Sequence, residues 1–196
     1  MRSQSAWVRG VNTYLSKGIS VEEAITVSGD FDARKSALSR RYIYLISNKK
    51  HPSPLMSQYF AHESRLLNCD AMHEAGQDLL GEHDFTSFRA SNCQSKSPMR
   101  NLMQLSVSRI KDIVLIDVTA NAFLQHMVRN IAGALIEVGL NRKSRSWLKE
   151  LLHKKNRNLA ARTASPNGLF LVDVTYPESM GIPVGPNSPH FFQLFV

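Results

Sequence analysis

Apolar positions in this chain repeat with two different periods, and the period predicts where helices and strands lie. In residues 121–139, NAFLQHMVRNIAGALIEVG, apolar side chains recur every three or four positions. This spacing predicts a helix that is buried along one broad face. The same spacing predicts a helix over residues 68–81 with Asn68 as its N-cap, and a further helix that begins at Ser144.

Strict alternation marks the strands. In residues 39–48, SRRYIYLISN, every second side chain belongs to the same face of a predicted strand. One face carries Tyr42, Tyr44 and Ile46, and the other carries Ile43 and Leu45. Residues 102–110 and 113–120 are β-rich runs hinged near Lys111 and Asp112, which predicts a hairpin leading into the helix at 121–139. Residues 168–176, GLFLVDVTY, predict a buried strand.

The order of elements is strand, helix, hairpin, helix, helix, strand. This order predicts an α+β fold in which helices cover one face of an antiparallel sheet. A sheet whose second face is bare or fringed by loops is a common platform for RNA, because unpaired bases can be spread across it.

Arg129 interrupts the otherwise apolar helix at 121–139. Its neighbours three and four positions away include no acid, so any carboxylate partner must come from another segment. Two interpretations are open. The side chain either covers apolar surface while its head reaches water, or it is buried against a carboxylate and marks a functional site.

Composition indicates an ordinary globular protein, with 196 residues of which 43% are hydrophobic. No apolar run is long enough to span a membrane, and the first residues lack the apolar stretch of a signal peptide. Cys69 and Cys93 show no metal-like spacing and are too few for a disulfide framework. We therefore expect a cytoplasmic protein without a membrane association.

The positive charge is clustered. The chain has 24 Lys and Arg against 16 Asp and Glu, a net charge of +8. Residues 34–50 contain six cations and no acid, and residues 141–162 contain eight cations and the single acid Glu150. Such patches are expected of proteins that bind nucleic acid, although a solvated basic face would give the same pattern.

Two further features have both a functional and a structural interpretation. Residues 84–98, DFTSFRASNCQSKSP, mix aromatic, charged and amide side chains as ligand-binding loops do. Alternatively, Phe85 and Phe88 fix the loop to the core while Arg89 pairs with Asp84. Tyr42 follows two arginines and could stack on a base, or it is a half-buried strand residue. The sequence contains no phosphate-binding glycine loop, metal-ligand grouping or serine elbow.

Four segments together resemble the tRNA pseudouridine synthase A family in order and spacing. They are FDARKSALSRRYIYLI, DFTSFRASNCQSKSP, NAFLQHMVRNIAGALIEVG and ASPNGLFLVDVTYP, with AWVRGVNTYL upstream. The resemblance covers about residues 5–178. It implies a remnant of the N-terminal subdomain at 1–39, a complete ferredoxin-like second half of the fold at 40–178, and a Pro- and Gly-rich tail at 179–196.

The resemblance implies isomerisation of uridine to pseudouridine in the anticodon stem-loop of tRNA, without cofactor or metal. It also implies a homodimer when the protein is full length. Tyr42 matches the family tyrosine that stacks on the flipped base, and Leu169 matches an apolar residue lining the other side of that pocket. Arg129 matches the arginine that pairs with the catalytic aspartate. We expect further RNA contacts from Arg34, Arg41, Arg89 and Lys96.

The catalytic aspartate itself has no match in this sequence. In the family it belongs to a loop upstream of AWVRGVNTYL, and none of the aspartates present stands in a comparable context. We therefore expect an N-terminally truncated synthase that lacks turnover as an isolated chain. The alternative is a non-catalytic RNA-binding remnant, or a partner subunit, of such an enzyme.

Overall fold

The computed structural model describes residues 2–183, and these form two units. The larger unit contains residues 37–175, and the smaller contains residues 2–36 and 176–183. Most of the Pro- and Gly-rich tail predicted at 179–196 lies outside the described residues. The assignment of residues 1–39 to a first subdomain stays a prediction.

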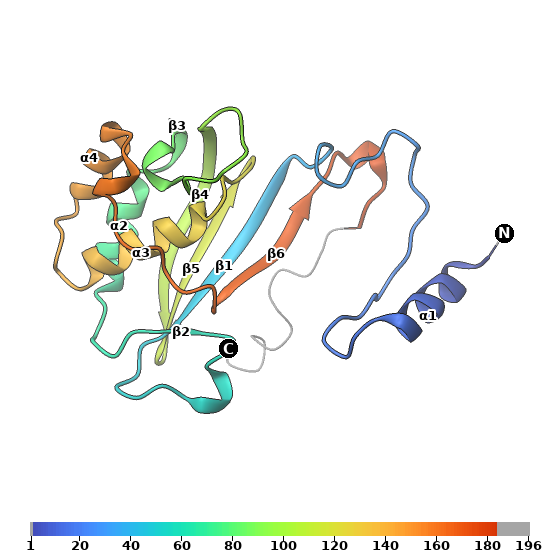
Figure 1. Cartoon of the computed structure of the whole chain (residues 1–196), viewed down its shortest axis with the longest axis horizontal. Coiled ribbons are helices and arrows are strands. Elements are labelled where there is room, and N and C mark those ends of the chain that lie inside the picture. Colours follow the sequence, from blue (N-terminus) through green and yellow to red (C-terminus); the bar gives the residue numbers. More distant parts are fainter. Residues whose placement is uncertain (1, 184–196) are drawn as a thin grey trace. The chain divides into compact units, whose positions relative to one another are not determined.

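The larger unit is built on one six-stranded sheet (Figure 1). Its strands are β1 Ser39–Ser47, β2 Ala61–His62, β3 Gly81–Asp84, β4 Met99–Ile110, β5 Ile113–Ala120 and β6 Leu169–Thr175. The strand order is β2-β1-β5-β4-β3, and β6 also pairs with β1. Every pairing is antiparallel except the short β1–β2 pair. The α+β class and the mainly antiparallel sheet predicted from the sequence are confirmed.

Three helices of this unit, α2 Cys69–Gln77, α3 Met127–Gly139 and α4 Trp147–Lys154, lie on one side of the sheet (Figure 1). Helix α2 packs on β4 and against α3, and α3 packs on β1. Asn68 caps α2 as predicted, because its side-chain oxygen accepts a hydrogen bond of 3.0 Å from the Ala71 amide.

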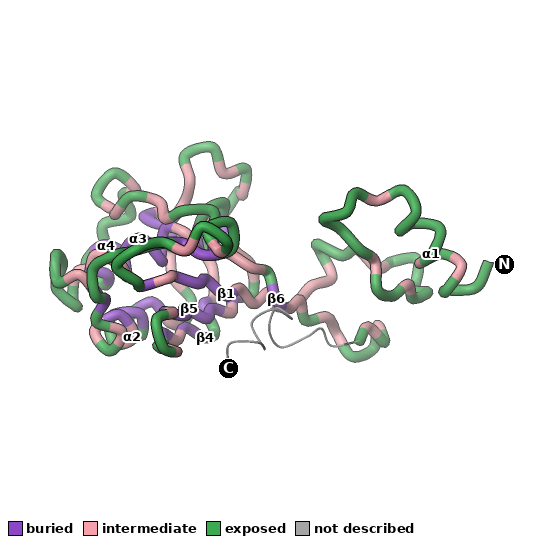
Figure 2. The backbone as a smooth tube through the Cα atoms, turned by 90° about the horizontal axis from the view of Figure 1, so that it is seen from below, coloured by how far each residue is buried: buried purple, intermediate pink, exposed green. Residues whose placement is uncertain are grey.

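The alternation along β1 divides the apolar side chains between two clusters. Tyr44 and Ile46 face the helices and belong to the main core, whereas Ile43 and Leu45 belong to a second, smaller cluster with Phe60. Figure 2 shows buried residues concentrated in β1, β4, β5 and the three helices. The face assignments predicted from the alternation are therefore confirmed.

The β4–β5 hairpin also matches its prediction. Its two strands meet at Lys111 and Asp112, and Lys111 adopts a left-handed backbone conformation with φ of 53°. Tight hairpin turns commonly require this conformation. Lysine adopts it at some energetic cost. The hairpin delivers the chain to the beginning of α3, as the sequence predicted.

Several predictions about boundaries and burial are wrong. The helix predicted over residues 68–81 ends at Gln77, and the helix predicted from Ser144 begins at Trp147. The helix predicted from residue 121 begins at Met127, because His126 has φ of 60° and the Asn121 side chain binds the amides of Asn101 and Ala122 instead. The strand predicted as buried at 168–176 is an edge strand in which only Val172 is buried. Strands β6 and β2 both pair with the same edge of β1. The other edge of β6 has no neighbouring strand among the described residues.

The smaller unit contains helix α1, Gln4–Tyr14, which has no buried residue (Figure 2). Its Ser3 caps the helix, and Asn12 binds both the amide and the carbonyl of Val21. Phe31 packs edge-on against Tyr176 with 5.2 Å between ring centroids. These contacts explain the local fold of this unit without a large core.

Candidate active site

Tyr42 lies near the beginning of β1, on the face that carries the helices. Its ring packs edge-to-face against Phe123, with centroids 5.1 Å apart and planes at 88°. It is half-buried, and this burial raises the pKa of the phenol above its ordinary value. Tyr42 is therefore a neutral ring at physiological pH, which suits stacking on a base better than proton transfer.

Arg129 lies on α3 and is held by the segment that leads into β6. Its Nε donates a hydrogen bond of 2.8 Å to the Ala164 carbonyl, and the Ala164 amide donates one of 3.1 Å to the Arg129 carbonyl. The side chain is half-buried, and among residues 2–183 no carboxylate lies within ion-pair distance of it. The guanidinium thus keeps donors available, although its position is fixed by backbone contacts.

Tyr44 lies two residues further along β1, on the same face as Tyr42, and it is fully buried. Its hydroxyl donates a hydrogen bond of 2.8 Å to the Ser165 carbonyl. Burial raises the pKa of Tyr44, and the nearby positive charge of Arg129 opposes that rise. Residues 164 and 165 therefore connect β1 with α3 through three hydrogen bonds that sequence patterns did not reveal.

Leu169 and Tyr42 share a face of the sheet but are not directly opposite one another. In the β1–β6 pairing Leu169 faces Tyr44, and Leu171 faces Tyr42. Leu169 packs on the main core, whereas Leu171 is 53% exposed beside the tyrosine. Leu171 is a site residue that the sequence analysis missed, although its alternation with Leu169 in GLFLV was a usable signal.

The polar side of α3, which includes Asn130 and Gly133, contacts the segment next to this site. Asn130 is buried, and its amide donates to the Phe88 carbonyl at 2.7 Å while its oxygen accepts from Thr163 at 2.7 Å. A Cβ placed on Gly133 would lie 2.2 Å from the Arg162 carbonyl oxygen. The polar strip of α3 is therefore the surface on which residues 162–164 pack.

Replacing Gly133 by Ala will lower the free energy of unfolding by about 1–3 kcal/mol, because the added methyl overlaps backbone that cannot move freely. This sign is opposite to the usual gain of about 1 kcal/mol for Gly to Ala inside a helix. Urea denaturation measures the change. Gly10→Ala in α1 is the matched control, since nothing lies within 4 Å of that position. Equal effects of the two substitutions would contradict the close packing at Gly133.

Arg41 lies on the other face of β1, away from Tyr42. Its Nη2 and Nε lie 2.5 Å and 2.9 Å from the two carboxylate oxygens of Asp117 on β5, which is itself buried. This hydrogen bonding raises the pKa of the Arg41 guanidinium. Asp117 faces Ile43 in the β1–β5 pairing, so the ion pair runs diagonally between the two strands. Its predicted role in RNA contact would have to compete with this ion pair.

The structural interpretation of the loop at 84–98 is confirmed for its two phenylalanines and wrong for Arg89. Phe85 and Phe88 are fully buried and fix the loop to the core. Arg89 does not pair with Asp84, because its Nη2 donates to the carbonyls of Cys93 and Ser95 at 2.7 Å and 2.6 Å. Asp84 instead forms an ion pair of 3.3 Å with Lys155.

The four residues predicted to contact RNA lie in three places. Arg89 and Lys96 share the loop at 84–98, where Lys96 is exposed. Arg34 is exposed in the smaller unit, beside Asp32, whose carboxylate accepts hydrogen bonds from two backbone amides. Arg41 lies on the second face of the sheet. Their contact with RNA stays a prediction.

Three of the eight cations in the basic stretch at 141–162 form ion pairs, two of them with acids that are distant in sequence. Arg142 pairs with Glu137 at 3.3 Å, Arg145 with Glu74 at 2.6 Å, and Lys155 with Asp84. Lys143 lies over the Trp147 ring. The charge density of this stretch is therefore lower in the folded chain than its sequence indicates.

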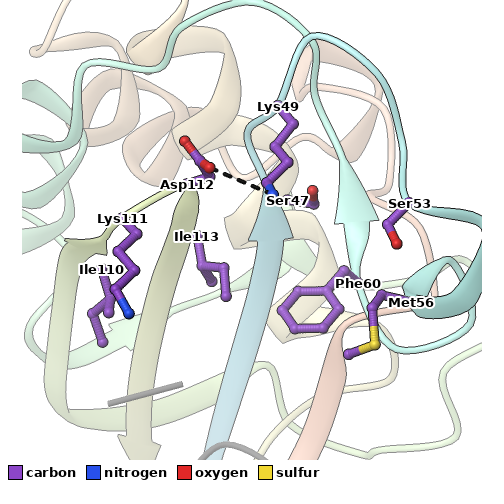
Figure 3. A pocket seen from close by; sticks show the side chains of 9 residues that line it. All are labelled: Ser47, Lys49, Ser53, Met56, Phe60, Ile110, Lys111, Asp112 and Ile113. Atoms are coloured by element: carbon purple, nitrogen blue, oxygen red, sulfur yellow. Dashed lines mark ion pairs between the residues drawn. The ribbon is translucent and has the colours of Figure 1, made fainter. Parts of the chain in front are cut away.

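A separate pocket lies on the second face of the sheet, near the end of β1 opposite Tyr42 (Figure 3). It has a volume of about 180 Å³, and its walls include Met56, Phe60 and Ile113. Lys49 and Asp112 form an ion pair of 3.5 Å at its side. This pocket shares no residue with the arrangement of Tyr42, Arg129 and Leu169.

Within the described range 2–183 no cluster of three or more His, Cys, Asp or Glu side chains could hold a metal ion. In the same range, no helix combines the length and apolar character needed to cross a membrane. Both cysteines are free.

Comparison with known proteins identifies close relatives. A family model described as tRNA pseudouridine synthase matches residues 75–177. A tRNA pseudouridine synthase A from Glaesserella parasuis is 51% identical over 191 residues, which is 97% of this chain and 73% of the relative. Proteins of the same name from Aliivibrio fischeri strain MJ11 and Shewanella woodyi are each 50% identical, over 97% and 93% of this chain. These two matches cover 72% and 70% of the relatives.

Proposed function

Because this chain belongs to the tRNA pseudouridine synthase family, we propose that it acts on uridine in the anticodon stem-loop of tRNA and that its site is built around Tyr42, Leu169 and Arg129. The reaction is an isomerisation. The bond between the ribose C1′ and the uracil N1 breaks, and a bond from C1′ to C5 replaces it. The proton lost from C5 is balanced by the one gained at N1, so no redox cofactor is needed.

The target base must leave its stack before any side chain can reach it. In this proposal Tyr42 provides one wall for the extruded base and Leu169 the other. Their common face of the sheet and the exposed Leu171 beside Tyr42 support this placement. The neutral, half-buried phenol gives a flat surface for stacking without a charge to solvate.

Arg129 has a different role in the proposal, because it positions the nucleophilic aspartate. The observation that carries this assignment is a half-buried guanidinium fixed through Nε to a backbone carbonyl, with its other donors free for a carboxylate. A guanidinium pairs with a carboxylate through two parallel hydrogen bonds, which would orient the acid toward the sugar. We propose that the aspartate comes from polypeptide outside the 196 residues of this sequence.

A second candidate function is RNA binding without turnover, as a remnant or partner subunit of such an enzyme. The absence of a carboxylate beside Arg129 among the described residues favours it for the isolated chain. Sequencing the gene upstream of Met1 separates the candidates. An in-frame aspartate loop supports the synthase, and a stop codon in its place supports the binding protein.

Substitution of Tyr42 tests the stacking role in a form of the protein that carries the aspartate loop. A suitable form joins this chain to the N-terminal region of the Glaesserella parasuis relative. Tyr42→Ala will reduce tRNA affinity and turnover together, by about ten- to a hundredfold, because stacking contributes about 1–3 kcal/mol per base. Tyr42→Phe will retain most of both.

Pseudouridine in a tRNA transcript is measured by mass spectrometry, and affinity is measured by filter binding. Loss of turnover in Tyr42→Phe would indicate that the hydroxyl has a chemical role and would contradict stacking as the main contribution. Full activity in Tyr42→Ala would remove Tyr42 from the site.

A further inference from the structure

A pocket of about 540 Å³ lies beside the beginning of α3. Its walls come from residues 90–92, from His126, and from residues 157, 158 and 160–163. Every polar side chain in its lining can donate a hydrogen bond, and no carboxylate is among them. These side chains are Ser91, Asn92, His126, Arg157, Asn158, Arg162 and Thr163.

The two arginines of this pocket differ from the other two arginines of the stretch 141–162. Arg142 and Arg145 each have an acidic partner. Among residues 2–183 neither Arg157 nor Arg162 has a carboxylate within ion-pair distance. The unneutralised arginines of the stretch are therefore concentrated at one pocket.

Arg157 is held rigidly although it lacks an acid. Its Nη1 donates to the Ala161 carbonyl at 2.9 Å, and its Nη2 donates to Asn130 Oδ1 and Thr163 Oγ1 at 3.1 Å and 2.9 Å. A fixed, partly desolvated guanidinium without a counter-charge attracts an anion, because the anion compensates the charge without a cost for ordering the arginine. Arg162 is exposed and can close on the same anion.

The wall of this pocket continues directly into the candidate active site. Residues 164 and 165 follow the pocket segment and bind Arg129 and the Tyr44 hydroxyl through their carbonyls. The Arg162 carbonyl itself packs on Gly133 of α3. An anion in the pocket would therefore lie along the same backbone segment that fixes Arg129.

We propose that this pocket binds a phosphate group of the RNA backbone close to the nucleotide that the Tyr42 and Arg129 site receives. The inference rests on the proposed function and extends it by naming where the backbone is held. Arginine suits the task because its planar donors match the oxygens of a phosphate. A phosphate contact here fixes the register of the RNA and carries no base specificity.

Arg162→Gln tests the proposal, with Lys149→Gln as a control that removes one charge from the same basic stretch outside the pocket. The affinity of the 196-residue chain for an anticodon stem-loop RNA is measured by fluorescence anisotropy at several salt concentrations. Arg162→Gln will lower the slope of log K against log salt by about 0.7–0.9, the value of one phosphate contact. Lys149→Gln will leave the slope unchanged. Identical slopes for the two variants would overturn the proposal.

A second variant, Asn92→Asp, places a carboxylate in the lining of the same pocket and will also weaken RNA binding. Wild-type affinity in Asn92→Asp would count against the pocket even if Arg162→Gln fails to fold. If the unaltered chain binds no RNA, the proposed function loses its support.

The pocket is then tested by an NMR titration of the chain with inorganic phosphate. Backbone amide resonances of Asn92, Asn158 and Thr163 that shift on adding phosphate, and do not shift in Arg162→Gln, support the site. Unchanged resonances overturn it.

Discussion

The 196-residue chain, purified by itself, will bind tRNA and form no detectable pseudouridine. The same chain joined to the N-terminal region of the Glaesserella parasuis relative will convert uridine at a measurable rate. The physical reason is that loss of a covalent nucleophile removes several orders of magnitude in rate. Loss of one phosphate contact, in contrast, costs about tenfold or less in affinity.

The measurement combines filter binding with mass spectrometry of digested tRNA. A version of the joined protein in which the loop aspartate is replaced by asparagine is the matched control, because it restores the fold without restoring the carboxylate. It should bind tRNA as tightly as the active form and show no turnover. Pseudouridine formed by the isolated chain would refute the proposed location of the nucleophile. Failure of the isolated chain to bind tRNA would refute the idea that binding is retained without it.

Arg129→Met in the active joined protein will lower kcat by about 10²–10³, the range typical for removal of one preorganised electrostatic partner at a reacting centre. KM will change little, since the arginine orients the aspartate and does not hold the RNA. Arg129→Lys will recover part of the loss, because it restores the charge without the planar pair of donors.

Arg109→Met separates this positioning role from a purely structural one. Arg109 on β4 also donates to a backbone carbonyl, that of Leu67, at 2.8 Å, and it also binds Asn48. It shares no contact with the candidate site. Both substitutions should lower the free energy of unfolding by about 1 kcal/mol per lost hydrogen bond, while only Arg129→Met should lower kcat. Equal kcat in both variants would show that Arg129 supports the fold alone.

The sequence determined much of the framework because its signals are local. Alternation assigned Tyr44 and Ile46 to one face of β1 and Ile43 and Leu45 to the other, and burial in the structure agrees. The cap at Asn68 and the turn at Lys111 were also readable, since each depends on backbone preferences within a few residues.

The beginning of α3 was not readable from its own residues. The apolar spacing continues through 121–126, yet these residues bind other segments, with the Gln125 carbonyl accepting from the Ala90 amide and the Asn121 side chain accepting from Asn101. Periodicity detects which residues are apolar and not which backbone groups are engaged elsewhere. Likewise, β6 was expected to be buried because its apolar run cannot reveal that it lies at the edge of the sheet.

Family resemblance selected Tyr42, Leu169 and Arg129, and the structure locates them on one side of the sheet around residues 164–169. It could not show that Leu171 faces Tyr42, because register across strands is a property of pairing. Nor could it show how the cations are neutralised. Glu74 and Asp84 are distant in sequence from the arginine and lysine that they pair with.

By itself, then, the sequence determined the main helices and strands of the larger unit without all of their boundaries, the two faces of β1, the class of fold and the family. Only the tertiary structure decided which polar groups meet. It joined Asn130 to Thr163 and Arg129 to Ala164, and it left Arg157 and Arg162 at one pocket without an acid among the described residues. The reason is physical, since local periodicity follows from the geometry of one helix or strand, whereas hydrogen bonds and charge compensation depend on segments that approach only after the chain has folded.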